Sequence, residues 1–483
     1  MGAARRLLRN LVSLSTGEAI SRLIGFTAFA LLARRLDPHD YGAVEFAVAL
    51  ALFFAMLVDF GLETIGARRI ARDRKEVNQL AAEIPAARLL MAFLAIPLMD
   101  AVPIVTGQPE HTAHLVWLFS LGLLAVPWFQ RWLFQGLDMM DWVSIGQVIR
   151  SAVFCLGVLI FVRGPADLLT VGKVEIMAAA VAAAFYLAVQ HKLVAPLRLH
   201  FSLKAMRRLY RESAFVGLSQ IVWASNQYWS TILVAVLATA VELSLFGVAQ
   251  RIVFAAVAFS WVYHFNLFPP LSRSLAESPR AFDSLVRASF RSISWLGIMI
   301  SLAGVLFADV VIRVVFGEAF EAAAIPLAIL VWAIPVTLLS GHARIALIAG
   351  GYQSSVFMSQ LAGVVMTVVV GVVTIPFYGA IGGAATTLAS YLAVWIASHM
   401  LAIRRIAPLP FFEVLRPLGV AMTIGVLREV FAPSSVVAGI AALVAYLILG
   451  LLFDRELLAD IKQLLARRTP APLPIKDSGA ENR

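Results

Sequence analysis

The sequence predicts an all-α, polytopic membrane protein with about 14 transmembrane helices. Its 483 residues are 61% hydrophobic and only 14% charged, and the mean hydropathy is +0.87. Apolar stretches of about 20 residues, the length that crosses a hydrocarbon core roughly 30 Å thick, recur from one end of the chain to the other. Because these stretches are continuous rather than alternating and are longer than barrel strands, we expect them to be helices.

The predicted spans leave only short connections between them, too short for a soluble catalytic domain. By residue number they lie at 10–33, 41–62, 84–105, 113–134, 142–163, 168–190, 213–238, 242–266, 290–312, 322–346, 353–376, 379–403, 413–431 and 434–453. The basic N-terminal segment resembles the start of a signal peptide. Glu18 and Arg22 interrupt the apolar stretch that follows it, so we expect an uncleaved first helix.

Basic residues gather in every second connection, and this bias predicts the orientation of the chain. One set of connections and the C-terminal tail carry most of them: Arg5, Arg6, Arg9, Arg68, Arg69, Arg72, Arg74, Lys75, Lys192, Arg198, Lys204, Arg207, Arg208, Arg211, Arg273, Arg280, Arg287, Arg291 and the tail residues. The opposite connections carry only Arg34, Arg35, Arg163, Lys173, Arg313 and Arg428. Both termini are therefore predicted to be cytoplasmic, in a cytoplasmic (inner) membrane. The amphipathic segments 64–80 and 197–212 should lie along the cytoplasmic face, and the polar tail after Pro470 should be disordered.

Composition argues against several other classes of protein. The net charge of +10 does not indicate nucleic-acid binding, because the excess basic residues lie at helix ends on one side. The single cysteine, Cys155, cannot form an internal disulfide and falls within a predicted span. The chain has no HExxH pattern, no phosphate-binding loop with a lysine and no paired acidic motif outside the spans. We therefore expect no cofactor, no metal ligands and no enzymatic activity.

A weak internal repeat divides the predicted spans into two sets. Tyr41-Gly42 aligns with Phe246-Gly247, and Gly136 aligns with Gly350 or Gly351 at a similar offset. Such a parallel repeat predicts two pseudo-symmetric six-helix bundles, at 1–205 and 206–405, followed by two further helices at 406–453 and a tail at 454–483. Chance similarity between apolar segments is the alternative. Two bundles that meet at a pseudo-twofold axis leave a cleft, which is the physical basis of alternating access.

Arg22, Arg88, Arg150 and Arg251 lie several residues or more inside predicted spans, where a charge should face a cavity or a partner. Arg22 follows Glu18 by one helical turn, and a pair that merely orients the first helix is the simpler interpretation. Arg88, Arg150 and Arg251 have no acidic residue one turn away in the sequence. The side chains of Arg88 and Arg150 can also extend to the cytoplasmic interface. Unpaired arginines in a cleft would suit a large anion such as a lipid-linked pyrophosphate, because guanidinium binds phosphate bidentately.

Other polar residues cluster in the first, second, seventh and eighth spans. We predict that Gln220, Asn226 and Gln250 join Arg22, Arg88, Arg150 and Arg251 in a cationic, substrate-binding cleft. Glu18, Glu45 and Asp59 are candidates for coupling to H⁺ or Na⁺, although Glu45 and Asp59 also lie where a cap at the end of a span is expected.

Several segments resemble the polysaccharide-transporter family of lipid-linked oligosaccharide flippases. The matching text comprises SLSTGEAISRLIGFTAFALLARRLDPHDYGAVEFA (14–47), DFGLETIGARRIAR (59–72), FQRWLFQGLDMMDW (129–142), FGEAFEAAAIPLAIL (316–330) and IPFYGAIGGAATTLASYL (375–392). The family belongs to a superfamily that also contains multidrug and toxic-compound extruders and lipid II flippases. Residues 21–26 also resemble the start of a lipid II flippase signature, but apolar residues at 27–30 replace the charges that should follow.

The resemblance implies export of a polyprenyl-pyrophosphate-linked oligosaccharide or polysaccharide repeat unit by alternating access, without ATP hydrolysis. It also implies a polysaccharide polymerase or export machinery as a partner. Three alternatives remain. A non-transporting scaffold for envelope synthesis would leave the buried arginines hard to explain. A cation-coupled multidrug extruder is disfavoured by arginines in the cleft, since its substrates are mostly cationic. A membrane glycosyltransferase or polymerase needs catalytic groups at the external face, usually on a large loop, and no external connection exceeds about 20 residues.

Overall fold

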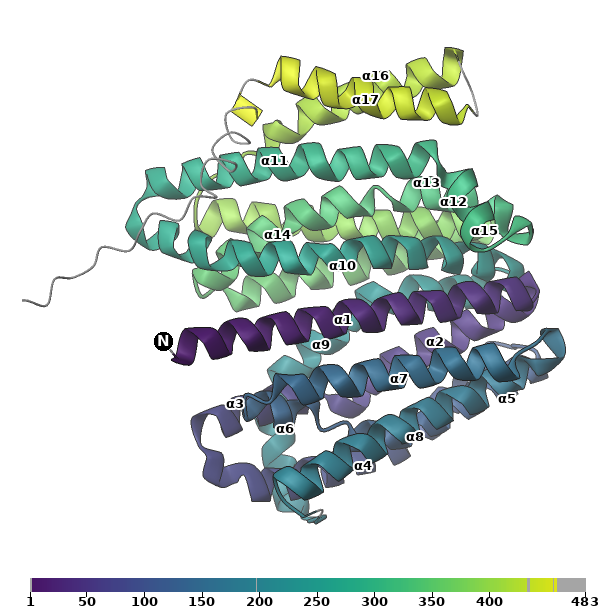
Figure 1. Ribbon diagram of the computed structural model, residues 1–483, viewed down its shortest axis with the longest axis vertical. Helices are drawn as coiled ribbons and strands as arrows, with labels where there is room; N and C mark the ends of the chain where they lie inside the picture. The colour runs from purple at the N-terminus through teal and green to yellow at the C-terminus, as the bar shows by residue number, and fades with distance from the viewer. Residues whose placement is uncertain (1, 197, 432–434, 455, 458–483) are drawn as a thin grey trace, which may run out of the picture.

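The computed structural model describes residues 2–196, 198–431, 435–454 and 456–457, and this part of the chain is helical and contains no strand (Figure 1). Within it, 11 segments are long and apolar enough to cross a membrane. The all-α polytopic fold is therefore confirmed, whereas the number of 14 spans stays a prediction. Most of the predicted tail, 458–483, lies outside the described residues.

The first helices follow the predicted spans closely. They are α1 (Gly2–Arg35), α2 (Pro38–Asp59), α3 (Leu62–Arg72), α4 (Val77–Val105), α5 (Glu110–Leu121), α6 (Arg131–Gly136), α7 (Met140–Phe161) and α8 (Leu168–Leu193), with 3-10 turns at Arg74–Glu76 (η1), Gly122–Trp128 (η2) and Pro165–Asp167 (η3). Asp37 caps α2 by accepting the N–H of Asp40 at 2.8 Å, and Pro38 begins the helix. The predicted amphipathic segment after α2 forms α3, which buries Leu62, Ile65 and Ile70.

The remaining helices include one that is longer than the sequence predicts. They are α9 (Leu203–Leu237), α10 (Ala240–Glu277), α11 (Pro279–Leu306), α12 (Ala308–Val315), α13 (Ala324–Leu330), α14 (Ala333–Ala349), α15 (Gln353–Arg405), α16 (Leu415–Phe431) and α17 (Val436–Phe453), with 3-10 turns at Glu318–Ala323 (η4) and Phe411–Val414 (η5). The amphipathic segment expected at 197–212 is not a separate element. From residue 203 onward it is the first part of α9, continuous with the span that follows.

Element α15 contains two of the predicted spans and reverses direction between them. Gly379 has φ 50°, in the left-handed region that glycine adopts without steric cost. Across the turn, Thr374 Oγ1 donates to the carbonyl of Gly382 at 3.2 Å, and further out Ser390 Oγ donates to the carbonyl of Gly363 at 3.1 Å. The contacting pairs are 374 with 382 and 363 with 390, so residues farther before the turn pair with residues farther after it. This is the pattern of two antiparallel helices. The predicted spans 353–376 and 379–403 are this helical hairpin.

Two predicted spans are broken rather than continuous. The stretch 113–134 consists of α5, the 3-10 turn η2 with Pro127, and the short helix α6. The stretch 322–346 begins within η4 and continues through α13 into α14. These are the fourth and tenth predicted spans, which occupy corresponding places in the predicted repeat. Interrupted helices in corresponding positions are typical of transporter binding sites.

Helices α1–α8, the first set, lie on one side of the molecule and α10–α15 on the other (Figure 1). Together with α9, which packs against α15 and α2, α10–α15 form the second set, while α16 and α17 lie beyond α11. Helix α2 packs against both α9 and α10. At this contact a Cβ on Gly42 would collide with the carbonyl of Ala240, and a Cβ on Gly247 would come within 2.6 Å of Glu45 Cγ. Small residues therefore let the two helices approach closely. The division into units at 1–205, 206–405 and 406–453 stays a prediction.

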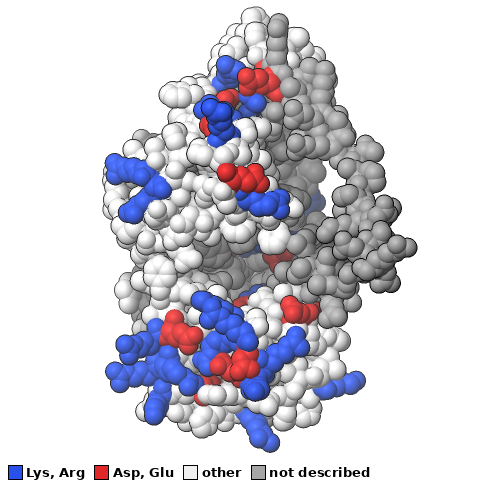
Figure 2. Space-filling model, turned by 90° about the vertical axis from the view of Figure 1, so that its left-hand side faces the viewer, with Lys and Arg blue, Asp and Glu red and all other residues white. Residues whose placement is uncertain are grey.

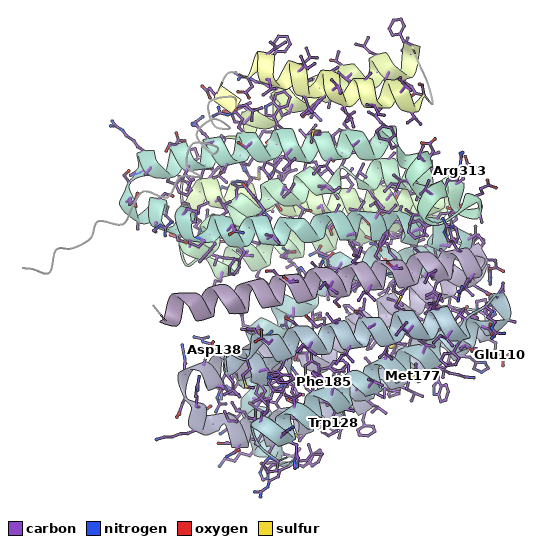
Figure 3. The ribbon with its side chains drawn as sticks, in the orientation of Figure 1. Glu110, Trp128, Asp138, Met177, Phe185 and Arg313 are labelled. Carbon is purple, nitrogen blue, oxygen red and sulfur yellow. The ribbon has the colours of Figure 1, made fainter. Side chains whose placement is uncertain are left out.

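The two ends of the bundle differ in charge. We call the end that holds the start of α1 and Asp138 the basic end, and the end that holds the α1–α2 connection, Glu110 and Arg313 the far end (Figure 3). Figure 2 shows the basic end, where many lysines and arginines gather among fewer acidic residues. Arg207, Arg208 and Arg211, in the first turns of α9, belong to this basic surface.

Candidate functional site

A cavity of about 780 Å³ lies among the first eight helices. Helices α1, α2, α4, α7 and α8 and the turn η2 form most of its wall, and Gln220 of α9 and Arg251 of α10 reach it from the second set of helices. Its charged lining residues are Glu18, Asp59, Glu63, Arg88, Arg131, Arg150, Glu175 and Arg251. The lining residues of α2 (48–59) and α7 (146–154) extend from the middle of these helices into their basic-end portions, whereas those of α1 (18–29) extend from its middle toward the far end. The cavity therefore begins near the middle of the bundle and occupies its basic half.

Helix periodicity and a broken helix shape this cavity. Glu18, Ser21, Gly25 and Phe29 recur every three or four residues, so they present one face of α1 to the cavity. Ser21 Oγ lies 2.6 Å from Ser151 Oγ of α7, which ties the two walls together. The interrupted fourth span contributes its 3-10 turn, where Gly122, Leu123 and Val126 line the cavity.

Arg251 and Glu45 form a bidentate ion pair that joins α10 to α2. Arg251 Nε lies 2.5 Å from Glu45 Oε1, and Arg251 Nη2 lies 2.9 Å from Glu45 Oε2. The guanidinium also stacks over the ring of Phe29, with its carbon 3.1 Å from the ring centroid. The side chain of Glu45 is only 5% exposed and that of Arg251 19%. Neither charge is stable at this depth without the other, because desolvating an unpaired ion costs several kcal/mol.

Three further arginines in the cavity also pair with carboxylates. Arg88 pairs with Asp59, whose carboxylate additionally accepts the N–H groups of Gly61 at 3.2 Å and Glu63 at 3.1 Å. Arg131 donates to Glu63 at 2.9 Å. Arg150 of α7 pairs with Glu175 of α8. The ion pairs differ in accessibility: the side chain of Arg88 is 2% exposed, whereas that of Arg150 is 40% exposed.

The expectation of unpaired arginines is therefore wrong, because Arg88, Arg150 and Arg251 each have a carboxylate partner from another helix. Arg22 pairs with Glu18 at 2.7 Å, as their spacing predicts. The cavity thus holds a balanced set of positive and negative groups rather than a purely cationic lining. An anion would bind there by taking the place of a carboxylate on an arginine.

Six of the ten predicted site residues line the cavity, and four do not. Glu18, Asp59, Arg88, Arg150, Gln220 and Arg251 do so. Arg22 and Glu45 lie beside it as ion-pair partners. Asn226 is buried and donates to Gln360 Oε1 at 3.0 Å, and Gln250 is buried and accepts from Thr231 at 2.8 Å. These two amides hydrogen-bond within the second set of helices, so their predicted place in the cavity is corrected.

The sequence interpretation missed Glu63, Arg131 and Glu175. Glu63 lies just beyond the second predicted span and Arg131 near the cytoplasmic end of the fourth, where charged residues are ordinary. Glu175 lies only a few residues inside its predicted span and has no arginine one turn away. The periodicity of α8 offers one signal, since Glu175 shares a helix face with Ala179, Ala182 and Tyr186, all of which line the cavity.

At the far end the first and second sets of helices are in direct contact. Arg34, in the last turn of α1, donates to the carbonyls of Val314 and, at 2.9 Å, Val315 at the end of α12. Tyr41 of α2 packs against Phe320 of η4, with ring centroids 5.4 Å apart. Phe26 of α1 packs against Phe316 at 6.1 Å. These contacts join the two sets of helices on the far-end side of the cavity, and the Phe26 contact lies directly beside it, since Gly25 and Phe29 line the cavity.

Both the sequence and the architecture of this chain are similar to those of known transporters. A putative O-antigen transporter of Escherichia coli strain K12 is 21% identical over 67% of this chain and 79% of its own length. One of Shigella flexneri is 23% identical over 65% and 78%. Among solved structures, the lipid II flippase MurJ in an inward closed conformation superposes with a TM-score of 0.72 at 12% identity, covering 92% of this chain and 99% of the other. An inward-facing multidrug resistance transporter of the MATE family and MOP superfamily superposes with a TM-score of 0.65 at 14% identity, covering 82% and 98%.

The two structural likenesses establish a shared fold. Residues 7–275, more than half of the chain, match the sequence profile of a family described as polysaccharide biosynthesis protein. This match includes the first eight helices, which form the cavity, and most of α10, which supplies Arg251. The chain therefore belongs to the polysaccharide biosynthesis protein family of multi-pass membrane proteins.

Proposed function

We propose that this protein is a flippase that moves a polyprenyl-pyrophosphate-linked oligosaccharide or polysaccharide repeat unit across the cytoplasmic membrane by alternating access. The observation that carries the proposal is the cavity in the basic half of the bundle, which contains arginines and is closed toward the far end. The family and the names of the relatives support a role in polysaccharide transport. The basic end is then cytoplasmic, with both termini on that side, because basic loops favour the cytoplasm.

The arginine–carboxylate pairs suggest how the headgroup is bound. A pyrophosphate carries more charge than a carboxylate and accepts bidentate hydrogen bonds from guanidinium, so it can displace Glu175 from the accessible Arg150. Displacing Glu45 from Arg251 would leave an unpaired carboxylate in a poorly solvated place, which is costly, so the accessible pair of Arg150 should exchange first. Coupling of substrate binding to H⁺ stays part of the proposal. The glycan and pyrophosphate occupy the cavity while the polyprenyl chain stays in the bilayer, where its transfer free energy is most favourable.

A cation-coupled multidrug extruder is the second candidate, because the MATE-family transporter shares the fold. Several carboxylates line the cavity, and a cationic drug would find acidic partners there if arginines moved away. Every cavity carboxylate that we described already has an arginine partner, so a cation would have to displace that arginine to bind there. The relatives named as putative O-antigen transporters favour the flippase. A glycosyltransferase or polymerase finds no support in the names of the relatives. Coupling to Na⁺ and contact with a polymerase stay parts of the proposal.

Deletion of the gene in its own organism tests the proposal. The deletion strain should lose surface polysaccharide and accumulate the lipid-linked repeat unit on the cytoplasmic side of the membrane, and the wild-type gene should restore both. Susceptibility to cationic drugs should not change. Normal surface polysaccharide together with increased drug sensitivity would instead identify an extruder.

A matched pair of variants tests the cavity itself. Arg150→Ala should abolish complementation, because it removes the accessible guanidinium of the cavity. Arg313→Ala removes a comparably exposed arginine, which pairs with Glu321 at 2.6 Å at the far end and does not line the cavity. It should complement fully, provided that both variants reach the membrane at wild-type levels by immunoblot.

A further inference from the structure

Two histidines and an aspartate from separate parts of the chain meet at the far end. His39 and Asp40 lie in the first turn of α2, and His111 lies in the first turn of α5, next to the labelled Glu110 (Figure 3). One ligand atom from each of the three lies within 4.8 Å of the others. His39 Nδ1 is 3.6 Å from Asp40 Oδ1, and the rings of His39 and His111 are 5.3 Å apart. Among the described residues, this is the one group of three such side chains with that geometry.

We propose that His39, Asp40 and His111 form a binding site for a divalent transition metal, and that Zn²⁺ is the ion that fits best. Imidazole nitrogen and carboxylate oxygen bind Zn²⁺ at about 2.0–2.2 Å, so tetrahedral neighbours lie roughly 3.4 Å apart. The separation of 3.6 Å between His39 and Asp40 is close to this value, and side-chain rotations can bring His111 to it. Three protein ligands leave a fourth position for water. Mg²⁺ and Ca²⁺ prefer all-oxygen sites and should bind poorly.

The hydrogen bonds around the cluster leave its ligand atoms available. His111 Nε2 is shielded from solvent and has no hydrogen-bond partner among the described residues. The capping role at the start of α2 belongs to Asp37, which accepts the backbone N–H of Asp40, so the carboxylate of Asp40 is not used for capping. A buried imidazole nitrogen without a partner is unfavourable, and a metal ion would satisfy it.

The place of the site suggests what the metal does. The residues that follow Asp40 are in contact with the second set of helices, since Tyr41 packs against Phe320 and Gly42 packs against Ala240. His111 anchors the cluster to α5, which belongs to the first set. A metal bound between α2 and α5 therefore fixes the first turn of α2 in the position that closes the far end. Zinc should stabilise the closed arrangement of this end.

Titration calorimetry of the full chain, purified in detergent with an affinity tag that lacks histidine and stripped of metal with a chelator, tests the site. Zn²⁺ should bind with a stoichiometry of about one, and His39→Ala and His111→Ala should each weaken binding at least tenfold. His114→Ala is the matched control. His114 lies one turn further along α5, and its side chain is 59% exposed. The His114→Ala variant should bind Zn²⁺ as tightly as the wild type does. Mg²⁺ should give no comparable heat.

Co²⁺ provides a second measurement, which does not depend on the stability of a single variant. The wild-type protein with Co²⁺ should show visible absorption bands of a four-coordinate site, and Asp40→Asn and His39→Gln should remove them while the proteins stay monodisperse on size exclusion. Absence of Zn²⁺ binding by the wild type would overturn the proposal. Binding that is unchanged in both His39→Ala and His111→Ala would equally overturn it, because the metal would then be held elsewhere.

Discussion

The two ends of this bundle use arginine in opposite ways. At the far end, Arg34 reaches from the first set of helices to backbone carbonyls of the second set, and aromatic rings pack beside it. In the basic half, Arg150 pairs with a carboxylate inside a cavity and remains 40% exposed. At the basic end, α9 contacts the first set of helices: Tyr210 Oη donates to the carbonyl of Ala87 of α4 at 2.9 Å.

The difference indicates which contacts must change during transport. The guanidinium of Arg34 is occupied by backbone carbonyls of the second set, so it is not free to bind a ligand. Its hydrogen bonds form when the far end is closed and break when that end opens. An ion pair with an exposed guanidinium can exchange its carboxylate for an anion of the substrate. We therefore regard the far end as a seal and the cavity as the binding site. The Arg251–Glu45 pair lies between them and joins the two sets of helices in the middle of the bundle.

The largest effect is expected for this central pair. Arg251→Ala should lower the free energy of unfolding by about 3–5 kcal/mol, because it leaves Glu45 buried without a partner. Glu45→Gln should also be destabilising, while the double variant Arg251→Ala/Glu45→Gln should recover much of the loss. Export should be absent in all variants that lack Arg251. Thermal unfolding in detergent and complementation measure the two properties, and a double variant with normal export would show that the pair is only structural.

A smaller effect is expected at the seal, and it has a matched control. Arg34→Ala removes two hydrogen bonds between the two sets of helices. Because Arg34 is exposed and water can replace these bonds, each should contribute only about 0.5–1.5 kcal/mol to stability, and their loss should shift the protein toward an open far end. Arg35→Ala removes similar bonds to the carbonyls of Val158 and Leu159, both at 2.9 Å, but these lie at the end of α7, within the first set.

The two variants should therefore differ in access rather than in stability. Labelling of a cavity cysteine from the far-end side should rise in Arg34→Ala and stay at the wild-type level in Arg35→Ala. Equal labelling of the two variants would mean that Arg34 does not seal this end.

The smallest effect on stability is expected for the Glu18–Arg22 pair, whose side chains are 41% and 47% exposed. Such i, i+4 pairs contribute about 0.3–0.5 kcal/mol, so Arg22→Ala should unfold at nearly the wild-type temperature. It should nevertheless reduce export, because Arg22 supplies positive charge beside the cavity. Unchanged export would assign Arg22 to the orientation of α1 alone, the simpler interpretation of its spacing.

Much of the helical architecture could be predicted because bilayer length and hydrophobicity act locally. The starts of α2 and α8 fall within a few residues of the predicted spans. Asp37 and Pro38 mark the start of α2, and Pro165 precedes that of α8. The break at η2 was not predicted, whereas the spans 353–376 and 379–403 were predicted with their boundary next to Gly379. An apolar run that contains proline reads as one span whether or not the helix continues through it, and the turn of α15 depends on a single positive φ.

The site was harder to predict than the helices, because its pairs join distant residues. A charge inside a membrane span should face a cavity or an oppositely charged partner, and this rule singled out Arg88, Arg150 and Arg251. All three line the cavity. Their partners come from other helices, so spacing could not identify them. The same holds for His39 and His111, which meet only because α2 and α5 begin at the same end of the bundle.

Access to the cavity is the most direct test of the account. Ser151 lines the cavity on α7, and a Ser151→Cys substitution in a Cys155→Ala background places one thiol there. A membrane-impermeant maleimide applied to sealed vesicles of each orientation should label this cysteine from the cytoplasmic side and leave it unlabelled from the other. Labelling only from the side opposite the cytoplasm, or from neither side while the denatured protein reacts fully, would contradict a cavity that opens at the basic end.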